Sequence, residues 1–137
     1  MYEYRCTVVK IIDGDTVDVD IDLGFGVWMK KQRIRMYGID TPESRTRDLE
    51  EKKYGLAAKK FLTGMLDDEA GIILKTHKDK EGKFGRILGE LWRTTNYADQ
   101  SINEYMIEKH HAVRYMGQSK ESIEEDHIKN RELVTFL

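Results

Sequence analysis

The segment 16–23 constrains the fold most, because its side chains alternate strictly between apolar and acidic. Its apolar members after Thr16 are Val17, Val19, Ile21 and Leu23, and its acidic members are Asp18, Asp20 and Asp22. Side chains with a period of two point to opposite faces of a strand, so one face is predicted to be buried and the other to meet water. The acidic side is interpreted as a solvated strand face rather than as a second cation site.

Strand signals continue on both sides of this segment. Residues 6–12 are rich in β-branched side chains and end at the turn Asp13-Gly14-Asp15, and residues 27–37 follow the turn Gly24-Phe25-Gly26. Three consecutive strands joined by short turns predict an antiparallel meander that curls into a barrel. Residues 71–77 and 86–92 predict two more strands, with a charged turn over 78–85 between them.

Three helices are expected around these strands. Apolar side chains recur at helical spacing from Tyr54 to Met65, whereas residues 43–53 are polar, lack periodicity and predict a loop. Ser101 is expected to cap a second helix over 102–109, and Ser122 a third that ends near residue 132. Five strands with a helix between the third and fourth is the order of an OB-fold. We therefore expect an α+β fold, a five-stranded OB-fold β-barrel with three α-helices, as a single domain over residues 1–137.

Composition excludes several classes of protein. No stretch approaches the roughly 20 apolar residues of a membrane helix, and residues 1–6 lack the apolar run of a secretory signal. We expect a chain without a membrane partner, in the cytoplasm or an unassigned compartment, and a monomer by default. Cys6 is the only cysteine, so it is predicted to be a small core residue.

The charge distribution leaves room for a nucleic-acid partner. The formal net charge is -2, which disfavours binding to a phosphate backbone. Basic residues nevertheless gather in segments 30–53 and 75–86, while segment 121–126 is acidic. One face of the molecule could therefore be basic, although charged loops alone predict only a solvated surface.

Oxygen donors and arginines suited to phosphodiester chemistry occur at separate places in the chain. Asp15 and Asp40, with a backbone carbonyl, can supply part of a calcium shell that water and phosphate complete. Arg35 and Arg86 could each bind phosphoryl oxygens through two parallel hydrogen bonds, and Glu43 could orient or deprotonate a water molecule. Each motif alone also has a structural explanation: a turn for Asp15, a helix start for residues 40–43 and a hairpin end for Arg86.

Five motifs, taken in order, resemble the staphylococcal nuclease (thermonuclease) family over about residues 6–133. They are Ile12-Asp13-Gly14-Asp15-Thr16-Val17, the stretch from Arg35 to Glu43, Lys53-Tyr54-Gly55, Lys83-Phe84-Gly85-Arg86 and Asn103-Glu104. The resemblance implies a five-stranded OB barrel with three helices. It also implies a calcium-dependent endonuclease and exonuclease that acts on DNA and RNA and leaves 3′-phosphate products.

The resemblance assigns the cation and phosphate contacts residue by residue. It places Asp15 and Asp40 on the family's calcium carboxylates, with Thr41 offering its backbone carbonyl. Arg35 and Arg86 fall on the two phosphate-binding arginines.

The remaining assignments concern water, substrate and one departure. Glu43 falls on the carboxylate that activates water, and Asp13 on a carboxylate near the metal. Lys83 and Tyr115 match residues that contact the substrate. Phe84 stands where the family's archetype has a tyrosine, so the handling of terminal phosphates is expected to differ.

The sequence also allows a function without catalysis, and it contains four histidines without an assigned role. A non-catalytic nucleic-acid-binding or partner-binding OB-fold module is the alternative, since a fold does not establish a function. Loss of the acidic ligands would mark such a module, and this chain retains them. The four histidines lack zinc-ligand spacing and are predicted to be surface or packing residues; they are His77, His110, His111 and His127.

Overall fold

A computed structural model describes residues 2–77 and 86–136, and the meander predicted from the sequence forms one side of its barrel. The three strands are β1 (Glu3–Asp13), β2 (Thr16–Gly24) and β3 (Val27–Met36), paired antiparallel. Val17, Val19 and Ile21 are buried, whereas the alternating aspartates of β2 are only half-buried. The period-two prediction is therefore confirmed for Val17, Val19 and Ile21. It is wrong for Leu23, which is 40% exposed near the end of the strand.

Two further strands close the barrel in the order β1-β2-β3-β6-β5. They are β5 (Ile72–Thr76), antiparallel to β1 and β6, and β6 (Ile87–Arg93), parallel to β3. With three helices this confirms the expected α+β fold. A separate two-stranded ladder, β4 (Ile39–Asp40) with β7 (Val113–Arg114), was not predicted because two-residue strands carry no pattern. The charged turn predicted over 78–85 lies outside the described residues.

Helix α1 (Leu49–Leu66) begins earlier than predicted. The Asp48 side chain accepts hydrogen bonds from the N–H groups of Glu50 and Glu51, so it caps the helix. The predicted loop over 43–53 is therefore wrong for residues 49–53, because the first helical turn is polar and exposed. Further along, α1 buries Ala58 and Leu62 against the barrel.

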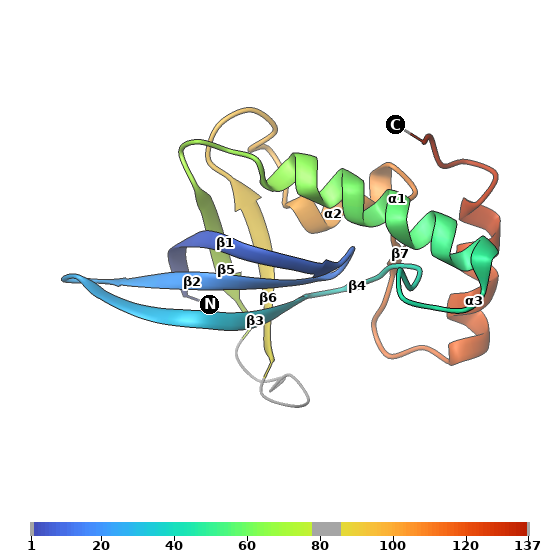
Figure 1. Cartoon of the computed structure of the whole chain (residues 1–137), viewed down its shortest axis with the longest axis horizontal. Helices are drawn as coiled ribbons and strands as arrows, with labels where there is room; N and C mark the ends of the chain where they lie inside the picture. The colour runs from blue at the N-terminus through green and yellow to red at the C-terminus, as the bar shows by residue number, and fades with distance from the viewer. Residues whose placement is uncertain (1, 78–85, 137) are drawn as a thin grey trace.

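Helix α2 (Ile102–Glu108) is capped by Ser101, as predicted. Helix α3 (Lys120–Asn130) is capped by Ser119 rather than Ser122, so its predicted start was wrong. Figure 1 shows β4 running from the end of β3 away from the barrel, toward the side of the molecule where α3 lies. No helix in the described part of the chain has both the length and the apolar character needed to cross a membrane.

The barrel core contains Cys6, which is 4% exposed. Burial raises the pKa of its thiol to about 12. Cys6 is therefore a core residue as predicted, and a thiol with so high a pKa is a poor nucleophile.

Asn103 connects α2 to the strands that end near β4. This buried side chain accepts from the Leu91 N–H at 3.1 Å and donates to the carbonyls of Tyr37 at 2.8 Å and Gly89 at 3.2 Å. Asn103→Ala removes these three hydrogen bonds, and among the described residues only the Gly89 carbonyl keeps a second donor, the Tyr37 N–H at 2.8 Å. We therefore expect a loss of about 1–3 kcal/mol of unfolding free energy. Urea denaturation measures this loss, and the exposed Asn96→Ala is the control. Equal stability of the two variants would contradict the structural role of Asn103.

Candidate functional site

Asp15 lies in the turn between β1 and β2 and is only 8% exposed. Its Oδ1 accepts the Thr16 hydroxyl at 3.0 Å, and its Oδ2 accepts the backbone N–H of Thr41 at 3.1 Å. The turn packs tightly on α1, because a Cβ on Gly14 would stand 2.9 Å from the Cβ of Ala58. The fold therefore fixes this carboxylate and brings Thr41 next to it.

Arg35, at the end of β3, contacts both carboxylates that the sequence proposed as cation ligands. Its Nη1 lies 3.3 Å from Oδ2 of Asp15, and its Nη2 lies 3.4 Å from Oδ1 of Asp40. The arginine side chain is 15% exposed, so these contacts are shielded from bulk water. Asp15, Arg35 and Asp40, whose outermost members are 25 positions apart, thus form one cluster.

Asp40 lies in β4 and has a second partner that the sequence did not indicate. Its Oδ2 is 2.8 Å from Nε2 of His127, a residue of α3. Of the two roles predicted for the histidines, surface or packing, His127 has the second, since its side chain is 13% exposed; its contact with Asp40 was not predicted. The two residues are separated by 87 positions, and no local spacing could have joined them.

Glu43 has an accessible side chain but lies between the buried residues Thr41 and Ser44, and hydrogen bonds of its backbone hold the segment in place. The Glu43 N–H donates to Oε2 of Glu51 at 3.0 Å, and the next N–H, of Ser44, donates to Oδ1 of Asp13 at 3.2 Å. Partial burial raises the pKa of Glu43, and nearby negative charges raise it further. Those charges belong to Asp13, Asp15, Asp40 and Glu51. Glu43 therefore shares the electrostatic environment of the cluster, and Asp13 holds the segment that carries it.

Three further residues were predicted to contact the substrate: Arg86, Tyr115 and Lys83. Arg86 is half-buried directly before β6, and two residues later Leu88 pairs with Arg35 in the parallel ladder. Tyr115 is 41% exposed, and its N–H donates to the carbonyl of Gly38 at 2.8 Å. Lys83, like Phe84, lies outside the described residues.

The donor set fits a hard divalent cation. Side-chain oxygens of two carboxylates lie near the Thr41 backbone, and among the described residues the buried Thr41 Oγ1 has no hydrogen-bond partner. Across residues 2–77 and 86–136, no three His, Cys, Asp or Glu side chains form a ready-made metal cluster. Asp15, Asp40 and the Thr41 carbonyl could supply only part of an oxygen shell, and water and phosphate would have to complete it.

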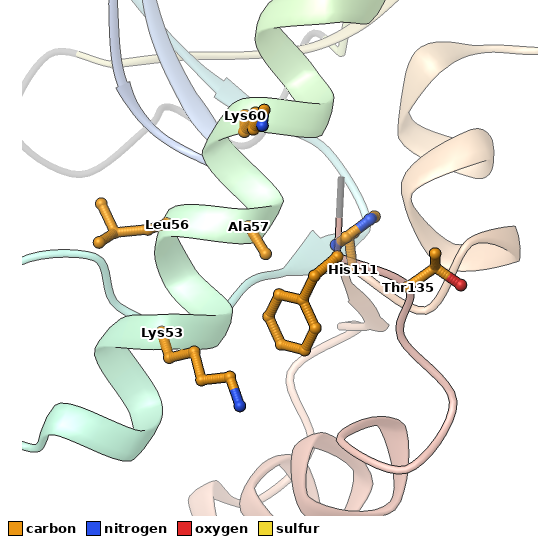
Figure 2. Close-up of a pocket in the computed structure, with 7 residues that line it drawn as sticks. Lys53, Leu56, Ala57, Lys60, His111 and Thr135 are labelled. Atoms are coloured by element: carbon orange, nitrogen blue, oxygen red, sulfur yellow. The ribbon is translucent and has the colours of Figure 1, made fainter.

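A separate pocket of about 210 Å³ lies between α1 and residues near the C-terminus (Figure 2). It is lined by Lys53, Leu56, Ala57, Lys60, His111, Thr135 and Phe136. None of the residues proposed from the sequence lines it, so it is distinct from the carboxylate cluster.

The burial of Asp15 has a pH-dependent consequence for stability. Burial raises the pKa of Asp15, although Arg35 and the Thr41 N–H oppose the rise. A carboxyl whose folded-state pKa is raised contributes stability below its unfolded pKa, roughly 3.9, and loses it as pH rises through the folded-state pKa. Asn at this position does not ionise. We therefore expect Asp15→Asn to become more stable relative to wild type as pH rises above about 4, in chelator. Thermal unfolding from pH 3 to pH 8 measures the difference, and a difference that moves the other way would show that Arg35 outweighs burial.

The sequence of this chain is similar to those of several known proteins. Residues 33–133 match the family described as staphylococcal nuclease homologue. The chain is 34% identical over 90 residues to a thermonuclease of Staphylococcus hyicus, covering 66% of this chain and 49% of that protein. It is 33% identical over 118 residues to Protein ParB of Escherichia coli, covering 82% and 58%, respectively. A thermonuclease of Staphylococcus intermedius is 32% identical over 85 residues, covering 62% and 46%. The chain thus spans about half the length of these curated relatives.

Proposed function

Because this chain belongs to the staphylococcal nuclease homologue family, we propose that it is a calcium-dependent nuclease that hydrolyses phosphodiester bonds of DNA and RNA. The observation that carries the proposal is the cluster in which Arg35 touches both Asp15 and Asp40. Two carboxylates, a guanidinium and the nearby Glu43 are the groups that such a reaction needs. We further propose that residues 1–137 act as one domain and as a monomer.

Asp15, Asp40 and the Thr41 carbonyl are the groups proposed to hold calcium. When bound, the ion supplies positive charge that stabilises the charge developing on the phosphoryl oxygens. The donor chemistry supports this choice, because Ca²⁺ takes carboxylate and carbonyl oxygens and leaves positions for water and phosphate. The acidic surroundings that raise the pKa of Glu43 also favour a cation here.

Three side chains of the protein have separate roles in the proposed hydrolysis. Glu43 accepts a proton from the water that attacks phosphorus, and its raised pKa makes it a better base than an ordinary carboxylate. Arg35 and Arg86 each present paired N–H groups to phosphoryl oxygens, a geometry that lysine lacks. The new bond joins water oxygen to phosphorus, and the bond to the 5′ oxygen breaks. That oxygen takes a proton from solvent water, and Glu43 returns its proton to solvent. The phosphate remains on the 3′ side.

The remaining residues are proposed to shape the substrate site. Tyr115 is hydrogen-bonded through its backbone to Gly38, two residues before Asp40, which supports a contact with the substrate. Lys83 is proposed to contact phosphate. Phe84 lacks the hydroxyl of a tyrosine at this position, so a contact with a terminal phosphate is proposed to be missing. Asp13 positions the Glu43 segment through the Ser44 N–H.

Cleavage in calcium and in chelator tests the proposal. Purified protein is incubated with supercoiled plasmid, single-stranded DNA and RNA, and the products are separated on gels. We expect nicking and degradation in calcium and none in chelator. Salt-dependent binding without turnover would contradict the proposal and favour a non-catalytic binding module.

A further inference from the structure

The shortest side-chain contact of Asp40 is made by α3 rather than by the barrel. His127 Nε2 lies 2.8 Å from Oδ2 of Asp40, whereas Arg35 lies 3.4 Å from the other oxygen, Oδ1. The Asp40 side chain is 32% exposed, and β4 around it is only two residues long. The contacts with Arg35 and His127 therefore restrain the rotamer of this partly exposed carboxylate.

Helix α3 is well placed to supply that restraint, because the chain around His127 is docked on both sides. Ile123, one turn earlier, is 8% exposed, and Asn130 donates its side-chain N–H to the Ala112 carbonyl at 3.2 Å. Just past the helix, the Tyr54 hydroxyl of α1 donates to the Arg131 carbonyl at 3.3 Å. His127 thus projects from a helix whose position is set by contacts with α1 and the segment before β7.

We propose that His127 is a positioning residue for the cation site, an inference that rests on the proposed function. In this proposal His127 has its proton on Nε2 and donates it to Oδ2 of Asp40, since a carboxylate oxygen is an acceptor. This bond turns Oδ1 toward Arg35 and Asp15, where the cation is proposed to bind. Residues that orient metal ligands in this way typically change metal affinity about 10–100-fold when replaced.

Substitutions at position 127 can distinguish the loss of the hydrogen-bond donor from the loss of side-chain packing. In His127→Gln the side-chain amide nitrogen lies about as far from the backbone as Nε2 of histidine, so it can donate to the same oxygen. In His127→Asn the same amide is one methylene shorter and falls short of Asp40. Lys129→Ala, an exposed change on the same helix, is the control for altering α3.

Calorimetric titration of the substrate-free protein with calcium chloride tests the proposal without using activity. We expect His127→Ala and His127→Asn to bind calcium about 10–100-fold more weakly, and His127→Gln and Lys129→Ala to stay near wild type. Circular dichroism in chelator confirms that each variant is folded. If either His127→Ala or His127→Asn fails to fold, the calcium affinity of His127→Gln is compared with that of the one that folds.

Each outcome separates this inference from the proposed function. If wild type binds calcium and all His127 variants bind it equally, the positioning role is wrong while the calcium site stands. If His127→Gln is as weak as His127→Ala, the hydrogen bond is not what matters and the proposal is overturned. If wild type itself binds no calcium, the proposed cation site fails, and this inference fails with it.

Discussion

Replacing Glu43 with glutamine is expected to lower the rate of phosphodiester cleavage by about 100- to 10,000-fold, the usual contribution of a positioned general base. The amide keeps the shape of the side chain but cannot accept the proton of the attacking water. Because Glu43 is exposed and surrounded by negative charge, the change should leave the unfolding free energy within about 0.5 kcal/mol of wild type or raise it slightly. Single-turnover cleavage of a labelled oligonucleotide in saturating calcium gives the rate.

Glu50→Gln is the matched control for this experiment. Glu50 is an exposed carboxylate in the first turn of α1, and it is absent from the set of charges that raise the pKa of Glu43. It should cleave at the wild-type rate. A Glu43→Gln variant that also cleaves at that rate would remove Glu43 from the chemistry.

The second large effect is expected at Gly55, which lies inside α1 against the segment that carries Glu43. A Cβ at Gly55 would stand 2.2 Å from the carbonyl oxygen of Glu43 and 2.7 Å from the backbone nitrogen of Ser44. Neither backbone atom can turn aside as a flexible side chain would, so Gly55→Ala must push the segment away from the helix. We expect a loss of about 1–3 kcal/mol of unfolding free energy. A shift of about 1 Å in Glu43 should also lower the cleavage rate on the order of 100-fold.

Gly64→Ala makes the same chemical change in the same helix without the obstacle. A Cβ there meets nothing within 4 Å, so the higher helix propensity of alanine should stabilise the protein by about 0.5–1 kcal/mol. Thermal unfolding and cleavage are measured on both variants. A Gly55→Ala variant as stable and active as Gly64→Ala would contradict the close packing of Glu43 on α1.

Much of the fold could be predicted because its main signals are local. The alternation in β2 and the turns around it produce three adjacent strands, and Ser101 caps α2 as its position predicts. The start of α1 could not be predicted from periodicity, because its first turn is polar and depends on the Asp48 cap. The start of α3 was misplaced for a related reason, since Ser119 and Ser122 are both plausible caps and only the structure distinguishes them.

The candidate site was partly predictable. Asp15, Arg35 and Asp40 were proposed as partners from motif order, and the structure brings them into contact. His127 could not be found in this way, because its contact with Asp40 depends on how α3 docks and not on any spacing. Gly55 shows the reverse case: the sequence offered the motif Lys53-Tyr54-Gly55 only as part of a resemblance, and the backbone contact now gives a physical reason for the glycine.

The most direct test of the central claim, that the Asp15, Arg35 and Asp40 cluster serves calcium-dependent phosphodiester hydrolysis, is analysis of product ends. A defined oligonucleotide is incubated with the protein in water enriched in heavy oxygen, with calcium or with chelator, and the fragments are weighed by mass spectrometry. The account predicts calcium-dependent fragments with 5′-hydroxyl ends and 3′-phosphates that carry the heavy oxygen, and none in chelator. Folded protein that binds the oligonucleotide in calcium but leaves it intact, or that produces 5′-phosphate ends, would contradict it.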